Sequence, residues 1–261
     1  MRYTPAHMRF QGRVALITAA GRGIGRATAE IIAREGGTVV LVDRDKAALD
    51  EVVGGIRAGG GVADGMAADG LDAAQVEDVV RRAVDTHRRI DILVNAVGGS
   101  TIVRKPAAPV EELSLQEWQQ LLDFNLTGTF LFLHAVVPVM KRQRSGKIVN
   151  ISSIAGRGLS ATSSSAYATA KGGIIALTRK LSLELGPHGI AVNAIAPSLT
   201  LSPRLLPRWE AMSPAEQARE IDRVPLRRIA RPEDQARVIC FLASADADFV
   251  TGVTIDVTGG Q

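Results

Sequence analysis

The sequence predicts an α/β fold in which helices cover both faces of a parallel sheet. Short runs that are apolar throughout alternate along the chain with longer stretches that carry apolar residues at helical spacing. Strands that read as continuous apolar runs are typical of parallel sheets, because such sheets are buried on both faces. The 261 residues, 46% of them hydrophobic and 22% charged, are enough for one α/β domain of about 250 residues.

Seven apolar runs are expected to be the strands of this sheet. They lie at residues 14–18, 38–42, 60–68, 90–94, 147–151, 190–195 and 253–257. Helical spacing of apolar residues between these runs predicts helices at 24–35, 46–57, 73–87, 115–140, 166–185 and 232–243. Gly36-Gly37 and Gly186-Pro187 end two of the helices, and Pro232 opens the last one. Because the carboxyl ends of parallel strands share one edge of the sheet, the loops after them should meet at one cleft.

Residues 1–10 mix polar and apolar types, so we expect a flexible extension before a domain that covers residues 11–261. No run of 18 or more consecutive apolar residues occurs, which argues against a membrane span. The one cysteine, Cys240, excludes an internal disulfide and fits a cytoplasmic protein. The net charge is +4, and the basic runs at 141–147 and 223–231 lack a nucleic-acid motif, so we interpret them as solvated surface. The four histidines are scattered, and we expect no catalytic metal.

The turn after the first strand is rich in glycine, with Gly21, Gly23 and Gly25. Glycines let a backbone approach a pyrophosphate closely, and the N-terminus of the next helix favours negative charge. The turn departs from the G-x-G-x-x-G pattern because Arg26 stands at the last glycine position. A dinucleotide site and a plain tight turn both remain open at this point.

Asp43 ends the second strand, about 20 residues beyond the glycines, where an acidic side chain can bind the adenosine ribose hydroxyls. A carboxylate there would repel a ribose 2′-phosphate, which favours NAD over NADP. Arg22 and Arg44 could instead bind that phosphate, so NADP stays possible. Asp43 could also simply cap the helix that starts near Lys46.

Tyr167 and Lys171 lie four residues apart on one face of an expected helix. A nearby ammonium favours the phenolate and lowers the tyrosine pKa, so the pair could exchange a proton with an alcohol or carbonyl. Ser153 follows the fifth strand and would face the same cleft.

With these motifs in this order, nearly the whole chain resembles the short-chain dehydrogenase/reductase family. The family's first glycine is replaced by Ala19, its N-N-A-G stretch appears as Asn95-Ala-Val-Gly98, and its P-G-x-x-x-T segment appears as 197–202. The resemblance implies a Rossmann fold, a general acid/base role for Tyr167 and a water held by Asn125. The implied catalytic set is Asn125, Ser153, Tyr167 and Lys171. The implied cofactor contacts are Thr18, Arg22, Gly23, Ile24, Gly25, Asp43, Arg44, Asp69, Asn95, Ala96, Gly98, Tyr167, Lys171, Pro197, Thr200 and Ser202.

The loop at 98–105 resembles that of dehydrogenases acting on carboxylated cyclohexadiene cis-diols. This weaker resemblance implies that Arg104, Lys105 or Arg204 binds a substrate carboxylate, the alternative being charges in solvated loops. The implied substrate contacts are Thr101, Arg104, Lys105, Ser153, Leu159, Tyr167 and Arg204. Residues 198–220, which hold several prolines and a polar helix at 214–220, are expected to form a mobile lid.

The function expected first is an NAD-dependent alcohol or diol dehydrogenase that can also run as a ketone reductase on a small molecule. A 3-oxoacyl-thioester reductase is the second hypothesis, since the basic runs could bind an acidic acyl-carrier protein. A cofactor-binding module without turnover is a third, which the presence of both Tyr167 and Lys171 disfavours. The family resemblance and the small residues of the Tyr167 helix favour a homodimer or homotetramer.

Overall fold

The computed structural model describes residues 8–261, whose seven strands form one parallel sheet. The strands are β1 (Val14–Thr18), β2 (Thr38–Asp43), β3 (Val62–Ala67), β4 (Ile92–Asn95), β5 (Gly146–Ile151), β6 (Ile190–Pro197) and β7 (Thr254–Val257). Their order is β3-β2-β1-β4-β5-β6-β7, so the direction of winding reverses between β1 and β4. The register places Ile17 of β1 beside Leu41 on one side and Val94 on the other. This is the expected Rossmann fold.

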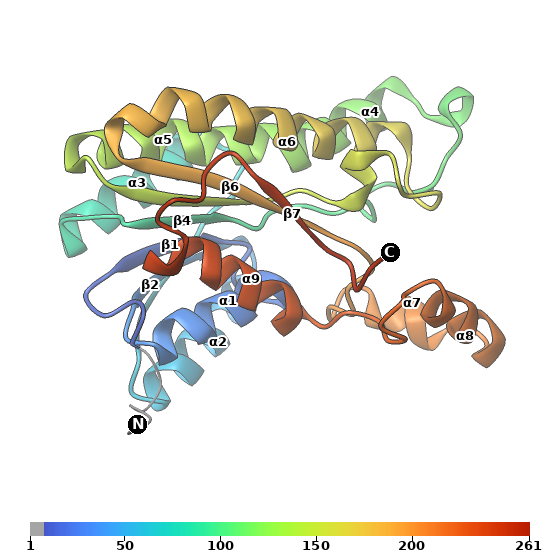
Figure 1. Cartoon of the computed structure of the whole chain (residues 1–261), viewed down its shortest axis with the longest axis horizontal. Coiled ribbons are helices and arrows are strands. Elements are labelled where there is room, and N and C mark those ends of the chain that lie inside the picture. Colours follow the sequence, from blue (N-terminus) through green and yellow to red (C-terminus); the bar gives the residue numbers. More distant parts are fainter. Residues whose placement is uncertain (1–7) are drawn as a thin grey trace.

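Helices cover both faces of the sheet (Figure 1). One face carries α1 (Gly23–Arg34), α2 (Lys46–Ala58) and α9 (Pro232–Ala243), and the other carries α3 (Ala73–His87), α5 (Gly128–Gln143) and α6 (Ser165–Leu185). Each face has its own apolar core, because successive strand residues point to opposite sides. Ile17 belongs to the α1 side and Leu16 to the α5 side, and both are fully buried.

The start of the chain packs on the domain earlier than the sequence predicted. Phe10, assigned to the extension, is fully buried in the core with α1. The Arg9 guanidinium donates to the Glu35 carboxylate, with Nε to Oε2 at 2.6 Å. Phe10 is a single apolar residue among polar neighbours, so no pattern in the sequence indicated that it is buried. Residues 1–7, the rest of the expected extension, lie outside the described residues.

The single helix expected at 115–140 is instead three helical pieces. α4 (Leu115–Leu122) passes into a π-helical turn at Asp123–Thr127, which continues as α5. Together Leu115–Gln143 is long and apolar enough to cross a membrane by length and composition alone. In this fold the stretch is a layer of the domain, because Phe132, Leu133 and Val136 are buried in the core against the sheet.

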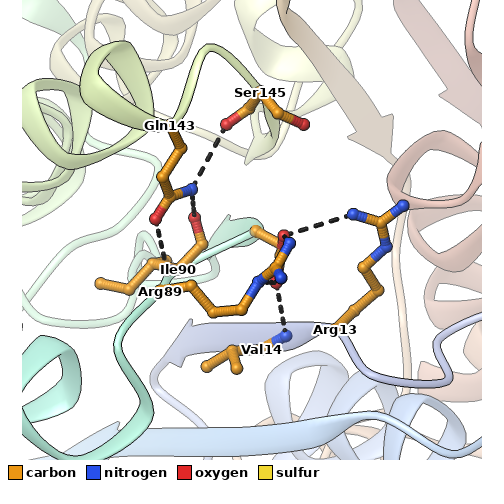
Figure 2. Close-up of polar contacts among 7 residues, drawn as sticks. Arg13, Val14, Arg89, Ile90, Gln143 and Ser145 are labelled. Carbon is orange, nitrogen blue, oxygen red and sulfur yellow. Dashed lines mark hydrogen bonds and ion pairs between the residues drawn. The ribbon is translucent and has the colours of Figure 1, made fainter.

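A buried acid ties the amino ends of the central strands together, at the edge opposite the carboxyl ends (Figure 2). Asp91, which is 4% exposed, accepts from the Val14 amide at 2.9 Å and from Arg89 Nε at 2.7 Å. Arg13 adds a longer ion pair at 3.4 Å. Nearby, the Gln143 side chain accepts from the Ile90 amide and donates to the Ile90 carbonyl. This cluster therefore joins β1, β4 and the end of α5.

The chain between β6 and α9 leaves the sheet at its carboxyl edge. It forms α7 (Leu206–Glu210) and α8 (Pro214–Asp222), which project beyond the strands (Figure 1). Ser213 caps α8 by accepting from the Glu216 amide, and the Glu216 carboxylate bonds back to the Ser213 amide. The polar helix predicted at 214–220 is therefore present, preceded by a short helix that the sequence analysis did not predict.

Candidate active site

The glycine-rich turn makes a tight connection from β1 into α1. Ala19 has a φ of 49°, in the left-handed region, and Gly23 has a φ of 58°. Gly25 lies so close to the Ala19 carbonyl that any Cβ would clash with it. Ala19 thus keeps the backbone conformation that glycine adopts without strain, and the turn retains its shape despite the substitution.

Asp43 lies beside this turn at the end of β2. Its Oδ2 accepts from the Gly21 amide at 3.0 Å, and its Oδ1 accepts from the Asp45 amide at 3.0 Å. The cap of α2 is Asp45, whose side chain accepts from the Ala48 amide, so the alternative that Asp43 caps this helix is wrong. Asp43 instead supports the turn and lines the cleft.

The two arginines near Asp43 differ in what they contact. Arg22 forms an ion pair with Asp45 at 2.7 Å, while Arg44 is exposed and lines the same cavity as Asp43. Within residues 8–261 Arg44 forms no ion pair. Arg44 is therefore the freer of the two cations for any phosphate that approaches Asp43.

Thr18 and Asn95, both expected to bind the cofactor, form hydrogen bonds that join the strands and loops bordering the cleft. The Thr18 hydroxyl accepts from the Ala96 amide at 2.9 Å and so joins the loops after β1 and β4. Asn95 is 1% exposed, and its Nδ2 donates to Asn150 Oδ1 at 2.9 Å. The structure places Asn95 among the strands and outside the cavities described below, because β4 continues through it before the loop begins.

The elements after β5 bring Ser153, Tyr167 and Lys171 together. Ser153 begins the short helical turn after β5, and Ser164 caps α6 by accepting from the Tyr167 amide. Lys171, one turn later on α6, is 2% exposed, and its Nζ donates to the Ile151 carbonyl at 2.8 Å. The same Nζ lies 5.9 Å from the centre of the Tyr167 ring. The spacing of four thus places both side chains at one site, as predicted.

Burial dominates the protonation of this pair. It raises the pKa of the Tyr167 hydroxyl, against smaller opposing effects of the Ser153 hydrogen bond and the charge of Arg204. Burial, with the nearby Arg204 charge, lowers the pKa of Lys171 to about 7. Lys171 is not among the groups that oppose this rise, and its Nζ donates to the Ile151 carbonyl. The partners that oppose the rise in the Tyr167 pKa are Ser153 and Arg204.

Asn125 sits in the π-helical turn and is fully buried. Its Oδ1 accepts from the Gly99 amide at 2.8 Å, and its Nδ2 donates to the carbonyls of Gly99 and Leu121. The side chain therefore shapes the loop after β4. A Cβ on Gly98 would lie 2.9 Å from Asn125 Oδ1 and 2.5 Å from Lys171 Nζ, so glycine is required where this loop passes the site.

Two cavities meet at Ser153 and Tyr167. The first, which we call the turn cavity, has about 380 Å³ and is lined by the glycine-rich turn, the loop after β4 and the start of the β6–α9 segment. The second, which we call the outer cavity, has about 350 Å³ and lies between the loop after β5 and α7. Both sizes are typical of small-molecule sites. A side cavity of about 130 Å³ adjoins the turn cavity and is lined by Thr18, Asp43, Arg44 and Asp69 among others.

The turn cavity gathers most of the residues expected to bind the cofactor. They are Arg22, Gly23, Ile24, Gly25, Asp43, Arg44, Ala96, Gly98, Tyr167, Lys171, Pro197, Thr200 and Ser202. The cradle fits a dinucleotide, because glycines leave room at the helix N-terminus while an acid stands at the end of β2. The lining also includes Phe124 and Ser152, which the sequence analysis did not predict.

The residues expected to bind substrate fall into three groups. Thr101, Leu159, Ser153 and Tyr167 line the outer cavity. Arg204 lines the turn cavity. Arg104 and Lys105 line neither cavity, and Lys105 is paired with Glu112 at 2.5 Å. The loop at 98–105 turns away from the site after Thr101, which removes these two cations from it.

The outer cavity also has an apolar side. Leu199, Leu205, Trp209 and Met212 line it from the β6–α9 segment, within the residues 198–220 that the sequence analysis expected to form a lid. In the part of the chain that the structure describes, no group of three or more histidine, cysteine or acidic side chains could hold a metal ion.

Comparisons with known proteins show which proteins this chain is similar to. A family model described as Enoyl-(Acyl carrier protein) reductase matches residues 18–261. The short-chain reductase protein NovJ of Streptomyces niveus is 40% identical over 259 residues, covering 96% of this chain and 94% of that protein. The 1,6-dihydroxycyclohexa-2,4-diene-1-carboxylate dehydrogenase of Acinetobacter baylyi is 37% identical over 262 residues, covering 97% of each. A 3-oxoacyl-[acyl-carrier protein] reductase from Brucella melitensis, solved with bound NAD, matches with a TM-score of 0.88 and 35% identity over 100% of this chain and 96% of that chain.

Proposed function

This chain belongs to the short-chain dehydrogenase/reductase family, and we propose that it interconverts a secondary alcohol, or a diol, and a ketone by hydride transfer with NAD(H). The observation that carries the proposal is the meeting of the two cavities at Ser153 and Tyr167. A reacting carbon in the outer cavity would have a hydroxyl donor and acceptor on one side and the turn cavity on the other. Such a site can hold both reactants of a hydride transfer at once.

The residues of the chain supply binding and proton transfer. A bound NAD⁺ would supply the acceptor for the hydride of the carbinol carbon, which is the cofactor's own chemistry. The Tyr167 phenol donates its proton to the substrate oxygen in reduction, and the Tyr167 phenolate takes the hydroxyl proton of the alcohol in oxidation. Ser153 donates a hydrogen bond to the substrate oxygen as charge develops on it. Lys171 lies beside Tyr167 and would hold a ribose hydroxyl, and Asn125 keeps the loop at Gly98 and Gly99 in place.

We propose NAD rather than NADP as the preferred cofactor. The Asp43 carboxylate is held at the end of β2 by the Gly21 and Asp45 amides, so it cannot easily move away from a ribose 2′-phosphate. Arg44 opposes this preference, since it is exposed beside Asp43 and forms no ion pair within the described residues. The fixed position of the acid gives it the larger effect.

The experiment that tests the proposal compares NAD⁺ and NADP⁺ reduction with matched secondary alcohols and diols, followed by nicotinamide absorbance. We expect turnover of at least one alcohol, with a higher kcat/KM for NAD⁺. Turnover of none, in either direction and with either cofactor, would contradict the proposal.

A second candidate is a 3-oxoacyl-thioester reductase. The similarity to the reductase from Brucella melitensis favours it. Such a substrate would place its thioester arm past the α7–α8 segment, where Arg208 and Arg223 line the outer cavity. Reduction of acetoacetyl-CoA with NADH, measured beside a simple ketone, separates the two candidates.

We also propose that the protein works in the cytoplasm as a homodimer or homotetramer and that residues 198–220 act as a lid over the outer cavity. The family resemblance and the small residues of α6 support the assembly. Sedimentation of the full chain would test it, and a monomer at micromolar concentration would contradict it.

A further inference from the structure

Arg204 is a cation inside the catalytic cleft. It lies on the β6–α9 segment, lines the turn cavity with Tyr167 and Lys171, and reaches across to the loop after β4. There its Nη2 donates to the Gly98 carbonyl at 2.8 Å. A Cβ on Gly99 would clash with the guanidinium, so the missing side chain of Gly99 makes room for it.

No acid neutralises this guanidinium among residues 8–261. Its one hydrogen bond is to a neutral carbonyl, and it forms no ion pair. The side chain stays accessible from the cleft, yet the surrounding walls remove part of its hydration and lower its pKa. A cation without a counter-charge attracts an anion that enters the cleft.

Two neighbouring basic side chains add to the positive charge of the cleft. Burial is the main cause that lowers the pKa of Lys171 and of Arg204. Like charges add to it, since Arg204 acts on Lys171 and Arg44 acts on Arg204, whereas Tyr167 raises the pKa of Arg204. Asp43, the acid of the turn cavity, already accepts from two backbone amides. An oxyanion beside Arg204 would relieve the repulsion among the three cations.

We propose that Arg204 binds an oxyanion at the hydride-transfer end of the cleft and exchanges the Gly98 carbonyl for it. Two sources share this chemistry, namely a carboxylate on the substrate close to the reacting carbon and the diphosphate of the cofactor. The position beside Tyr167 and Gly99 favours the substrate carboxylate. The planar guanidinium can bind either group through two parallel hydrogen bonds. This inference rests on the proposed function.

The test compares the wild-type protein with Arg204→Gln and Arg204→Lys. Arg34→Gln is the matched control, because Arg34 is an exposed arginine in the last turn of α1 that forms no ion pair within residues 8–261. Each protein is titrated with NADH by fluorescence. The NADH complex is then titrated with cyclohexanecarboxylate by calorimetry. Oxidation of 2-hydroxycyclohexane-1-carboxylate is measured beside that of cyclohexanol, and thermal unfolding checks that every variant folds.

If the substrate supplies the oxyanion, Arg204→Gln weakens cyclohexanecarboxylate binding and raises KM for the hydroxy acid by about tenfold or more, which corresponds to the loss of one charge-assisted contact. The loss is then larger for the hydroxy acid than for cyclohexanol, and the NADH Kd changes by a smaller factor than the Kd of cyclohexanecarboxylate. If the cofactor supplies it, the NADH Kd rises by a similar factor. Arg204→Lys restores part of the lost affinity, because lysine keeps the positive charge but cannot form the two parallel hydrogen bonds of a guanidinium.

Unchanged NADH and cyclohexanecarboxylate affinities in Arg204→Gln would overturn the inference. The two binding titrations do not depend on turnover. Failure of the proposed function, seen as no oxidation of any alcohol by the wild-type protein, is therefore distinguishable from failure of this inference.

Discussion

The side chain of Asn125 holds the backbone of Gly99 at both of its polar groups. Oδ1 accepts from the Gly99 amide at 2.8 Å, and Nδ2 donates to the Gly99 carbonyl at 3.2 Å. This pairing places a residue of the π-helical turn against the loop that borders Lys171 and Arg204. The wider π-turn brings the asparagine into the site, and such turns are frequent where helices carry functional residues.

Asn125→Ala should loosen this loop. The Gly99 amide would be left buried without an acceptor, which costs about 1–3 kcal/mol. We expect a lower free energy of unfolding in urea and a lower kcat. Gln119→Ala, on the exposed side of α4, should leave both near the wild-type values. Wild-type stability and turnover in Asn125→Ala would contradict a supporting role for this residue.

Ala19→Gly should stabilise the protein. Ala19 is held at a φ of 49°, where a Cβ is strained by about 1 kcal/mol and glycine is not. Thermal unfolding should therefore move to a higher temperature. The adjacent Ala20→Gly is the control, because Ala20 is fully buried and has no positive φ, so its substitution should destabilise. Equal losses in both variants would show that Ala19 carries no strain.

Asp91→Asn should destabilise the protein by about 2 kcal/mol, since a buried acceptor for two arginines and one amide loses its charge. The measurement is the free energy of unfolding in urea. Asp78→Asn makes the same chemical change on the exposed face of α3, where ion pairs contribute about 0–1 kcal/mol. Similar small effects in both would refute the structural importance of the Asp91 cluster.

Lys171 should make stability depend on pH. Its folded pKa is about 7, against an ordinary value of 10.5. Between these values the unfolded chain binds a proton that the folded protein does not, so the free energy of unfolding rises with pH. Below pH 7 the folded protein must keep a buried ammonium, which is unfavourable. Wild-type stability should therefore rise relative to Lys171→Met from pH 7 to pH 9, whereas parallel curves would contradict the lowered pKa.

Much of the fold could be predicted from the sequence because each strand is an uninterrupted apolar run. The seven expected strands are all present, with ends within a few residues of those predicted. The π-helical turn could not be predicted, since the apolar residues at helical spacing continue on both sides of it. The burial of Phe10 could not be predicted either, because it depends on packing against α1, which no local pattern indicates.

The candidate site could also be predicted only in part. Tyr167 and Lys171 are four residues apart on one helix, so local geometry alone predicts that they are neighbours. Arg104, Lys105 and Arg204 looked equivalent as loop cations. Only the path of the loops separates them, because Glu112 binds Lys105 while Gly99 leaves space for Arg204. Charges on irregular loops are therefore where sequence reasoning is weakest.

The most direct test of the account is Tyr167→Phe, which removes one hydroxyl from a residue that lines both cavities. NADH affinity is measured by fluorescence titration, and turnover of the best alcohol is measured by nicotinamide absorbance. Loss of proton transfer should lower kcat by at least about 100-fold while the NADH Kd stays within about twofold of the wild-type value. A variant that keeps its turnover would contradict the role of Tyr167 as the general acid/base and, with it, the proposed mechanism.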